Sequence, residues 1–169
     1  LWFPVDVSTS SRATIGGMAG NNSAGGRSIR YGIMRDNVVS IDTILSDGSK
    51  AHFGLAKESL CGLEKVFPTL IKIAEKNQKE IENRYPKVLR RVGGYNLDAL
   101  LPDTLASRPG SNGNEKDINL SHLIVGSEGT LAYSTSIKLK LSPLPPPKIM
   151  ALCHFSTFYE AMDSAQHIV

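Results

Sequence analysis

The sequence predicts an α+β fold in which an antiparallel sheet of about five strands is flanked by helices. Residues 38–45 are rich in β-branched side chains, which favour strands, and Asp47-Gly48 follows them as the preferred pair of a two-residue hairpin turn. Apolar residues recur at three- and four-residue spacing over residues 66–81, which indicates an amphipathic helix. Residues 131–141 alternate between apolar and polar, the period of a half-buried strand.

The remaining elements follow from turn and capping signals. Lys50–Phe53 is the expected returning strand of the hairpin. Pro68 is expected to open the main helix and to separate it from a short helix at residues 60–66, and Pro86 is expected to end it. Residues 149–155 are expected to form a further strand, followed by a terminal helix through residue 168 that Ser156 or Thr157 caps.

Composition limits the class of protein. A chain of 169 residues that is 41% hydrophobic and 21% charged has room for one globular domain and little more. The net charge of +3 comes from scattered basic residues, which argues against nucleic-acid binding. No apolar run reaches the length of a membrane span and no signal-peptide pattern is present, so a cytoplasmic location is the default, with membrane association of a full-length protein left open. Cys61 and Cys153 form no C-x-x-C pattern and are expected to be buried small hydrophobes.

The chemistry of the chain concentrates in residues 13–32, here called the glycine segment. Glycine permits positive φ and close approach to the main chain, and successive N–H groups in such a segment can converge on an anion. Asn and Ser side chains add short donors, and Arg27 and Arg30 follow directly. The segment therefore predicts a phosphate or pyrophosphate site, with a plain glycine-rich surface loop as the alternative.

Two familiar phosphate loops do not fit. A Walker loop ends in Gly-Lys-Ser/Thr, and the chain contains no Gly-Lys pair. A Rossmann fingerprint needs G-x-G-x-x-G between a strand and a helix, whereas Gly16, Gly17 and Gly20 read G-G-x-x-G and the following residues are expected to continue as loop.

Several motifs together resemble a known family, the FAD-linked oxidases of the vanillyl-alcohol oxidase and para-cresol methylhydroxylase (PCMH) type. Within it, the most similar branch holds glycolate oxidase and the D-lactate and D-2-hydroxyglutarate dehydrogenases. The motifs are Pro4-Val-Asp6 with Ser8, Ala13-Thr-Ile-Gly-Gly17, the Asn-x-Ala-Gly-Gly run at residues 22–26, Arg30-Tyr-Gly32 and Val125-Gly-Ser-Glu-Gly-Thr-Leu131.

The resemblance implies a domain division. Residues 1–147 would be the second half of a PCMH-type FAD-binding domain, and residues 148–169 the beginning of a substrate domain. In that family an earlier glycine-rich loop holds the other side of the pyrophosphate, so the chain is expected to be a fragment. Residues 90–102 resemble an insertion of the larger members, which makes a substrate-side role for Arg90, Arg91 or Tyr95 an open alternative. Residues 104–117 are expected to form a flexible loop.

FAD is the cofactor that the resemblance implies. Thr14 and Ser23 would add hydroxyl donors, Ser28 and Tyr31 would continue the cradle toward the flavin, and Glu128 would accept from a ribose hydroxyl or adenine amine. Ordinary readings stay open: a solvated entry loop for residues 4–8, and a turn or cap carboxylate for Glu128. The full candidate set is Pro4, Asp6, Ser8, Thr14, Gly16, Gly17, Gly20, Asn21, Asn22, Ser23, Ala24, Gly25, Gly26, Ser28, Tyr31, Gly32, Glu128 and Gly129.

By the same resemblance, the reaction is hydride transfer from a D-2-hydroxy acid to FAD. The family keeps its base, substrate arginines and His-rich metal site in the later substrate domain, so no catalytic residue and no metal ligand is assigned here. The four histidines do not cluster in the sequence. Two other function classes compete: a flavin- or nucleotide-holding module without chemistry, and an interaction domain whose glycine segment holds nothing.

Overall fold

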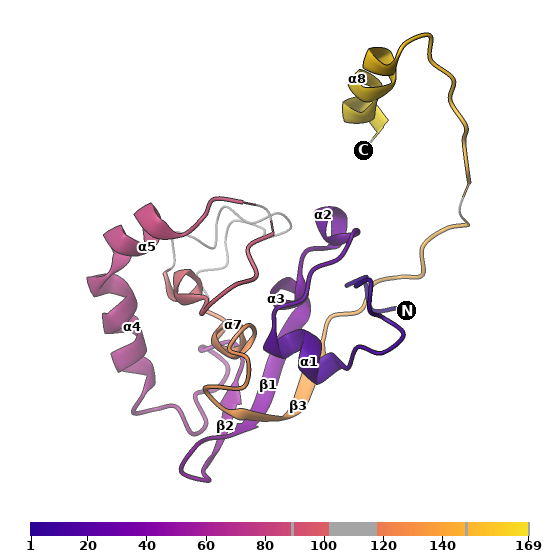
Figure 1. Ribbon diagram of the computed structural model, residues 1–169. Coiled ribbons are helices and arrows are strands. Elements are labelled where there is room, and N and C mark those ends of the chain that lie inside the picture. Colours follow the sequence, from indigo (N-terminus) through magenta and orange to yellow (C-terminus); the bar gives the residue numbers. More distant parts are fainter. Residues whose placement is uncertain (89, 102–117, 148, 169) are drawn as a thin grey trace.

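The computed structural model describes residues 1–88, 90–101, 118–147 and 149–168. The loop expected at residues 104–117 lies outside the described residues. The remainder is an α+β unit with an antiparallel sheet, as the sequence predicts (Figure 1).

The sheet has β1 (Val38–Ile44) at its centre, between β2 (Lys50–Phe53) and β3 (Tyr133–Leu139). Ile41 pairs with Phe53 on one side and with Ile137 on the other, so apolar residues meet across all three strands. The described residues hold three strands in this sheet rather than about five. Residues 149–155 are extended but exposed and unpaired, because no neighbouring strand is present for them to join.

The β1–β2 hairpin differs slightly from the expected two-residue turn. The Leu45 N–H donates to the Ser49 carbonyl at 2.8 Å, and the Gly48 N–H donates back to the Leu45 carbonyl at 3.0 Å. Gly48 has φ +82°, so three residues form a turn that ends in a left-handed glycine. Asp47 supports the turn by accepting from the Ser49 N–H at 2.9 Å.

The long helical tract is two helices, α4 (Phe67–Lys76) and α5 (Gln78–Arg84). Pro68 stands in the first turn of α4, as predicted. The break at Asn77 was not expected. Its side-chain amide donates to the Ile73 carbonyl at 2.7 Å, and its backbone (φ −106°, ψ 14°) leaves helical geometry. Residues 60–66 are turns rather than the expected short helix.

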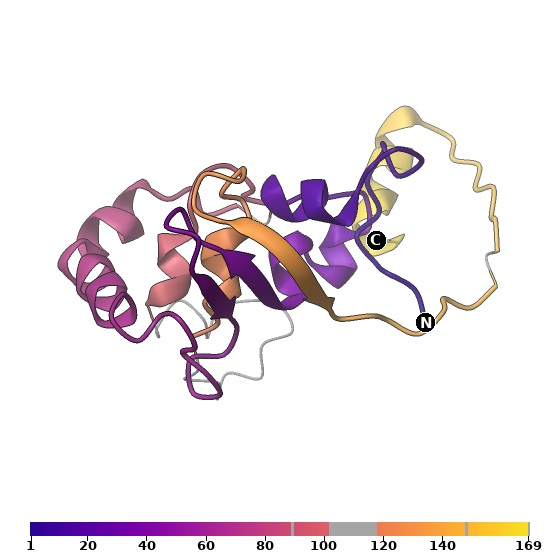
Figure 2. The same ribbon diagram turned by 90° about the horizontal axis from the view of Figure 1, so that it is seen from below.

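The glycine segment is not the continuous loop that its composition indicates. It contains α1 (Ile15–Gly20) and α2 (Ser28–Tyr31), and α3 (Met34–Asn37) follows. These three short helices gather at one end of the molecule, and α4 and α5 lie at the other (Figure 2). The core between them includes the fully buried Met34, Ile41, Leu63, Leu100, Leu120 and Val125.

Two further short elements complete the body. The 3₁₀ helix η1 (Leu97–Leu100) begins after Gly93-Gly94 and packs against α4, α5 and α7 (Ser121–Ile124). This short element ending before Pro102 was predicted from the sequence.

The C-terminal helix α8 (Phe158–Ile168) lies apart from the body at the end of a long extended connection (Figure 1). Thr157 caps it, since the Thr157 Oγ1 accepts from the Glu160 N–H at 3.2 Å. Phe158 and Tyr159 are about four-fifths exposed. Cys153 on the connection and Cys61 in the 60–66 turns are also exposed. The expectation that both cysteines are buried is therefore wrong, because neither lies on a core-facing element.

Candidate functional site

The first turn of α1 is built for a close approach. Thr14 caps the helix, because its Oγ1 accepts from the Gly17 N–H at 3.1 Å. A Cβ at Gly16 or Gly20 would meet nothing within 4 Å, so the helix offers open backbone on that side. A Cβ at Gly17 would lie 3.0 Å from the Thr14 Oγ1. The Thr14 hydroxyl thus holds the helix N-terminus in place.

Gly25 is needed for a different reason from the one that the sequence suggests. A Cβ there would lie 1.6 Å from the carbonyl oxygen of Asp6, so only glycine lets the N-terminal segment pass. The Gly25 N–H donates to the Ser28 Oγ at 3.0 Å. Gly26, by contrast, would place a Cβ in open space.

The Gly126-Ser-Glu-Gly129 turn lies directly against the end of α1. The Gly126 N–H donates to the Ala19 carbonyl and the Glu128 N–H donates to the Gly20 carbonyl, both at 2.9 Å. Gly126, Glu128 and Gly129 all have positive φ. The two glycine-containing regions, which are far apart in the sequence, thus form one continuous site.

A groove of two adjoining hollows opens beside this junction. The larger, about 450 Å³, is lined by Val7, Ser8, Thr9, Asn21, Ser23, Ala24, Val92, Gly93 and Glu128. The smaller, about 190 Å³, is lined by Thr9, Ala13, Thr14, Gly17, Met18, Asn21 and Ser23. The hollows share Thr9, Asn21 and Ser23, so the groove runs from the first turn of α1 to Glu128.

The lining chemistry fits one part of a dinucleotide. Among the described residues that line the groove, Glu128 is the one with a charged side chain, and the other polar groups are hydroxyls and the Asn21 amide. Short neutral donors beside open glycine backbone suit phosphate oxygens. An exposed carboxylate at the other end suits a ribose hydroxyl or an exocyclic amine.

The predicted site residues separate into two groups. Seven line the groove: Ser8, Thr14, Gly17, Asn21, Ser23, Ala24 and Glu128. Gly16, Gly20 and Gly129 are chain neighbours of these residues, and they and Gly26 have open space at the Cβ position. Their contacts with a cofactor remain predictions.

The others have identifiable partners inside the fold. Pro4 is fully buried. Asp6 pairs with Arg27 at 3.2 Å, and Tyr31 packs edge-on against Trp2 with ring centroids 5.6 Å apart. Gly32 has φ +78° and would clash with Asp36 if it carried a Cβ. These contacts, like the hydrogen bond that the Ser28 Oγ accepts from the Gly25 N–H, show that each of these residues contributes to the fold itself.

Asn22 belongs to the interior rather than to the groove. It is fully buried with φ +51°, and its Oδ1 accepts from the Arg35 N–H at 3.0 Å. Its buried Nδ2 has no hydrogen-bond partner within the described residues. Asn22 therefore leads into a polar network behind the groove.

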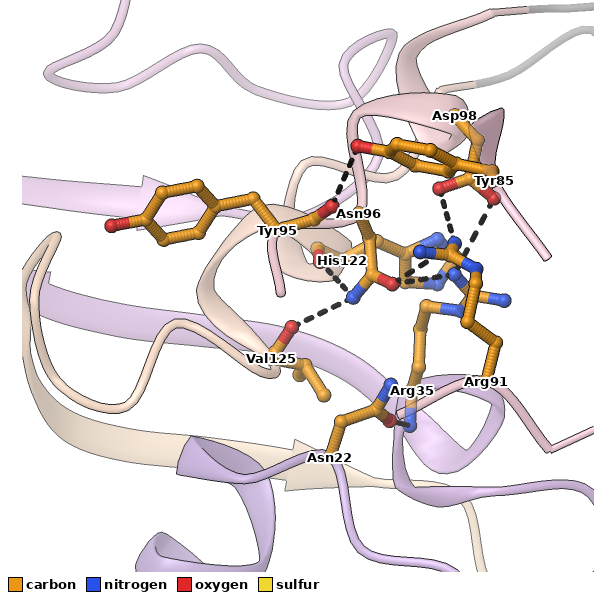
Figure 3. A network of polar contacts seen from close by, with 9 residues as sticks. All are labelled: Asn22, Arg35, Tyr85, Arg91, Tyr95, Asn96, Asp98, His122 and Val125. Atoms are coloured by element: carbon orange, nitrogen blue, oxygen red, sulfur yellow. Dashed lines mark hydrogen bonds and ion pairs between the residues drawn. The ribbon is translucent and has the colours of Figure 1, made fainter. Parts of the chain in front are cut away.

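That network joins residues that are far apart in the sequence (Figure 3). The Asn96 Oδ1 accepts from the Arg35 Nη1 at 2.7 Å, and Asp98 pairs with both Arg35 and Arg91. Arg91 also lies over the ring of Tyr85, with its Cζ 4.5 Å from the centroid. Arg91, considered above for a substrate-side role, is thus committed to internal contacts.

The two other substrate-side candidates also contact the fold. The Tyr95 hydroxyl lies 2.8 Å from the Thr130 Oγ1, and the Arg90 Nη1 donates to the Gly25 carbonyl at 3.2 Å. Sequence reasoning missed Val92 and Gly93, which line the groove from this same segment. No local sequence signal marks them, because their place in the groove depends on long-range packing.

The histidines offer no metal centre among the described residues, where no group of three His, Cys, Asp or Glu side chains could hold an ion. His52 Nδ1 lies 2.6 Å from Asp42 Oδ1 on the sheet. Within the described residues, no helix is long and apolar enough to cross a bilayer.

Comparison with known proteins agrees with this geometry. Residues 1–54 match a family described as FAD binding domain. The glycine segment and α1 fall within that match, which confirms FAD as the predicted cofactor.

The whole chain is similar to enzymes of the branch that the motifs indicate, which confirms the resemblance. It is 28% identical to D-2-hydroxyglutarate dehydrogenase of Pseudomonas putida, with 100% of this chain and 16% of the relative covered. It is 28% identical to a probable mitochondrial D-lactate dehydrogenase of Danio rerio, with 100% and 23% covered. It is 27% identical to glycolate oxidase subunit GlcD of Bacillus subtilis, with 100% and 24% covered. The chain therefore spans a quarter or less of the length of these relatives.

Proposed function

We propose that this chain is the FAD-binding portion of a flavin-dependent oxidoreductase that oxidises a D-2-hydroxy acid of the lactate, glycolate or 2-hydroxyglutarate type. The observation that carries the proposal is the groove formed where the Gly126–Gly129 turn is hydrogen-bonded to the end of α1. The similarity to three kinds of enzyme named for 2-hydroxy acids supports the substrate class.

We divide the chain between two domains of the proposed enzyme. Residues 1–147 would form the second half of the FAD-binding domain, and residues 148–169 the start of a substrate domain. The separation of α8 from the body, with its exposed apolar side chains, supports this boundary. The base, the substrate ligands and any metal site would lie on that further domain, and a 2-hydroxy acid would be bound mainly there.

Bound FAD would supply the hydride acceptor. The chain's own residues bind and orient it. Thr14 fixes the first turn of α1, so that the backbone at Gly16, in that first turn, is held in place for phosphate oxygens. Ser23 and Asn21, joined by a 2.6 Å hydrogen bond, present polar groups to both hollows. A hydrogen bond to a charged acceptor contributes about 1.5–3 kcal/mol, so three or four of them account for tight retention.

The second candidate function is a flavin- or nucleotide-holding module without chemistry. Its supporting observation is that the described residues of this chain bring no acid–base pair into the groove, where Glu128 is the one ionisable side chain. Turnover of a D-2-hydroxy acid by the protein expressed from its complete gene separates the two. The cytoplasmic location proposed from composition stays open, because two relatives are named as mitochondrial.

The experiment that tests the proposal is Gly17→Val in the protein expressed from its complete gene. The valine would crowd the Thr14 Oγ1 and cover the first turn of α1, so we expect flavin retention to be abolished while the protein stays folded. The flavin-to-protein ratio from the visible spectrum measures this. The matched control is Thr69→Val on the exposed face of α4, away from the groove, which should retain the wild-type ratio. A wild-type ratio in Gly17→Val would contradict the loop assignment.

A further inference from the structure

We propose that Asn96 is a positioning residue for the cofactor: it holds the Gly126–Gly129 turn and the glycine segment at a fixed separation, and so sets the width of the groove that takes the dinucleotide. This inference rests on the proposed function, since it concerns the same groove. It assigns a role in that groove to a residue that lies beyond the matched 1–54 region.

The amide of Asn96 first fixes the entry to the Gly126–Gly129 turn. Its Nδ2 donates to the Val125 carbonyl at 2.8 Å and to the His122 carbonyl at 3.0 Å. Val125 directly precedes Gly126, whose N–H is bonded to the Ala19 carbonyl. Both hydrogens of one side-chain amide are thus used on the chain that leads to Glu128 (Figure 3).

The oxygen of the same amide is linked through Arg35 to the segment that forms the other wall of the groove. The Asn96 Oδ1 accepts from the Arg35 Nη1 at 2.7 Å, and the Arg35 backbone N–H donates to the Asn22 Oδ1 at 3.0 Å. Asn22 lies between Asn21 and Ser23, which line both hollows. One side chain therefore connects, through short hydrogen bonds, to the walls that carry Glu128 and Asn21.

Asn96 does not line the groove, and only 1% of it is exposed. Asn96 lies in the interior next to the groove. Val92 and Gly93, from the same segment, form a third part of the groove lining. Ion pairs hold this segment in place, because Asp98 pairs with both Arg35 and Arg91. A buried polar network specifies one arrangement through the bonds it makes, and within the described residues the Asn22 Nδ2, at one end of this network, has no hydrogen-bond partner.

The position requires a side chain that donates at one end and accepts at the other. Aspartate has the same shape and would still accept from Arg35, but it would place a carboxylate oxygen against two carbonyl oxygens. Serine is shorter, so it loses the amide that donates to Val125 and His122 and the oxygen that accepts from Arg35, without burying a negative charge. These two substitutions change the hold on Val125 and leave the groove lining untouched.

The test compares Asn96→Asp and Asn96→Ser with Asn77→Asp. Asn77 is the matched control, because its amide also donates to a backbone carbonyl, that of Ile73, on α4 away from the groove. In the protein expressed from its complete gene, stripped of flavin, we expect the Asn96 variants to raise the Kd for FAD about tenfold or more, the equivalent of one well-made hydrogen bond. Asn77→Asp should leave it unchanged.

Amide hydrogen exchange on the flavin-free protein expressed from its complete gene gives a second readout. We expect faster exchange at Gly126 and Glu128 in the Asn96 variants, and an unchanged exchange rate for the backbone amides of the paired strands β1 and β3. A purely structural role would speed exchange throughout. Folded variants with a wild-type Kd, or exchange that rises uniformly, would overturn the positioning role. If the wild-type protein itself binds no FAD, the proposed function fails, and local exchange at Gly126 and Glu128 still decides whether Asn96 holds this turn.

Discussion

The backbone N–H of Glu128 donates to the carbonyl oxygen of Gly20 at 2.9 Å, at the point where α1 ends. Glu128 has φ +52°, a conformation that non-glycine residues seldom adopt. Glu128 thereby lines the larger hollow together with Asn21 and Ser23. The groove thus arises from two regions that neither sequence proximity nor a single motif would bring together.

Gly25→Ala should destabilise the fold. The new Cβ would lie 1.6 Å from the Asp6 carbonyl oxygen, so one of the two backbones must move. We expect the free energy of unfolding to fall by about 3 kcal/mol, the upper end of the range for overpacking. Urea denaturation measures it. Gly26→Ala is the control, since its Cβ meets nothing and its φ is not positive, and a change within about 1 kcal/mol is expected. Equal stability of the two variants would contradict the close passage of Asp6.

Asp98→Asn should weaken the network behind the groove. Arg35 and Arg91 have side chains only 10% and 12% exposed and share this carboxylate. Removing one partner of buried charges costs about 3–5 kcal/mol, and we expect a value near the lower end because Asp98 is 17% exposed.

The exposed pair of Glu80 with Arg84 is the comparison for that variant. Their side chains are 65% and 80% exposed, so Glu80→Gln should change the free energy of unfolding by less than about 1 kcal/mol. Guanidinium denaturation of both variants makes the comparison. A similar small loss in Asp98→Asn would show that the network does not stabilise the fold.

Acid should weaken the β1–β2 hairpin through Asp47. Hydrogen bonds from the Ser49 hydroxyl and the Ser49 N–H lower the pKa of Asp47 below its ordinary value of 3.8. Because the pKa is lower in the folded state, the stabilisation is present above pH 3.8 and is lost as the pH falls through the folded-state value. Asp47→Asn should therefore show a smaller loss of stability than the wild type on this acid side. Unfolding midpoints at several pH values check it, and identical acid profiles would count against the Ser49 contacts.

Local patterns predict most of the scaffold. The run of β-branched residues predicted β1, and the alternation of apolar and polar residues predicted β3. Pro68 predicted the start of α4. The expected strand at residues 149–155 is absent because strand formation needs a partner, which composition cannot report. The break at Asn77 depends on a single side chain bonding its own helix.

The site was predictable in composition but not in shape. Glycine disfavours helices, so its abundance hid α1, although Thr14 is a capping residue placed directly before it. The groove's third wall at Val92 and Gly93 and the role of Asn96 come from long-range packing. Several residues that line the groove could therefore be named from the sequence, but the surface that completes the groove could not.

The most direct test of the account is a crystal structure of the protein expressed from its complete gene with FAD bound. We predict that the pyrophosphate oxygens lie within hydrogen-bond distance of backbone N–H groups of residues 16–26, with the nucleotide in the groove beside Glu128. A pyrophosphate held entirely by other parts of the protein, with this groove empty, would contradict it.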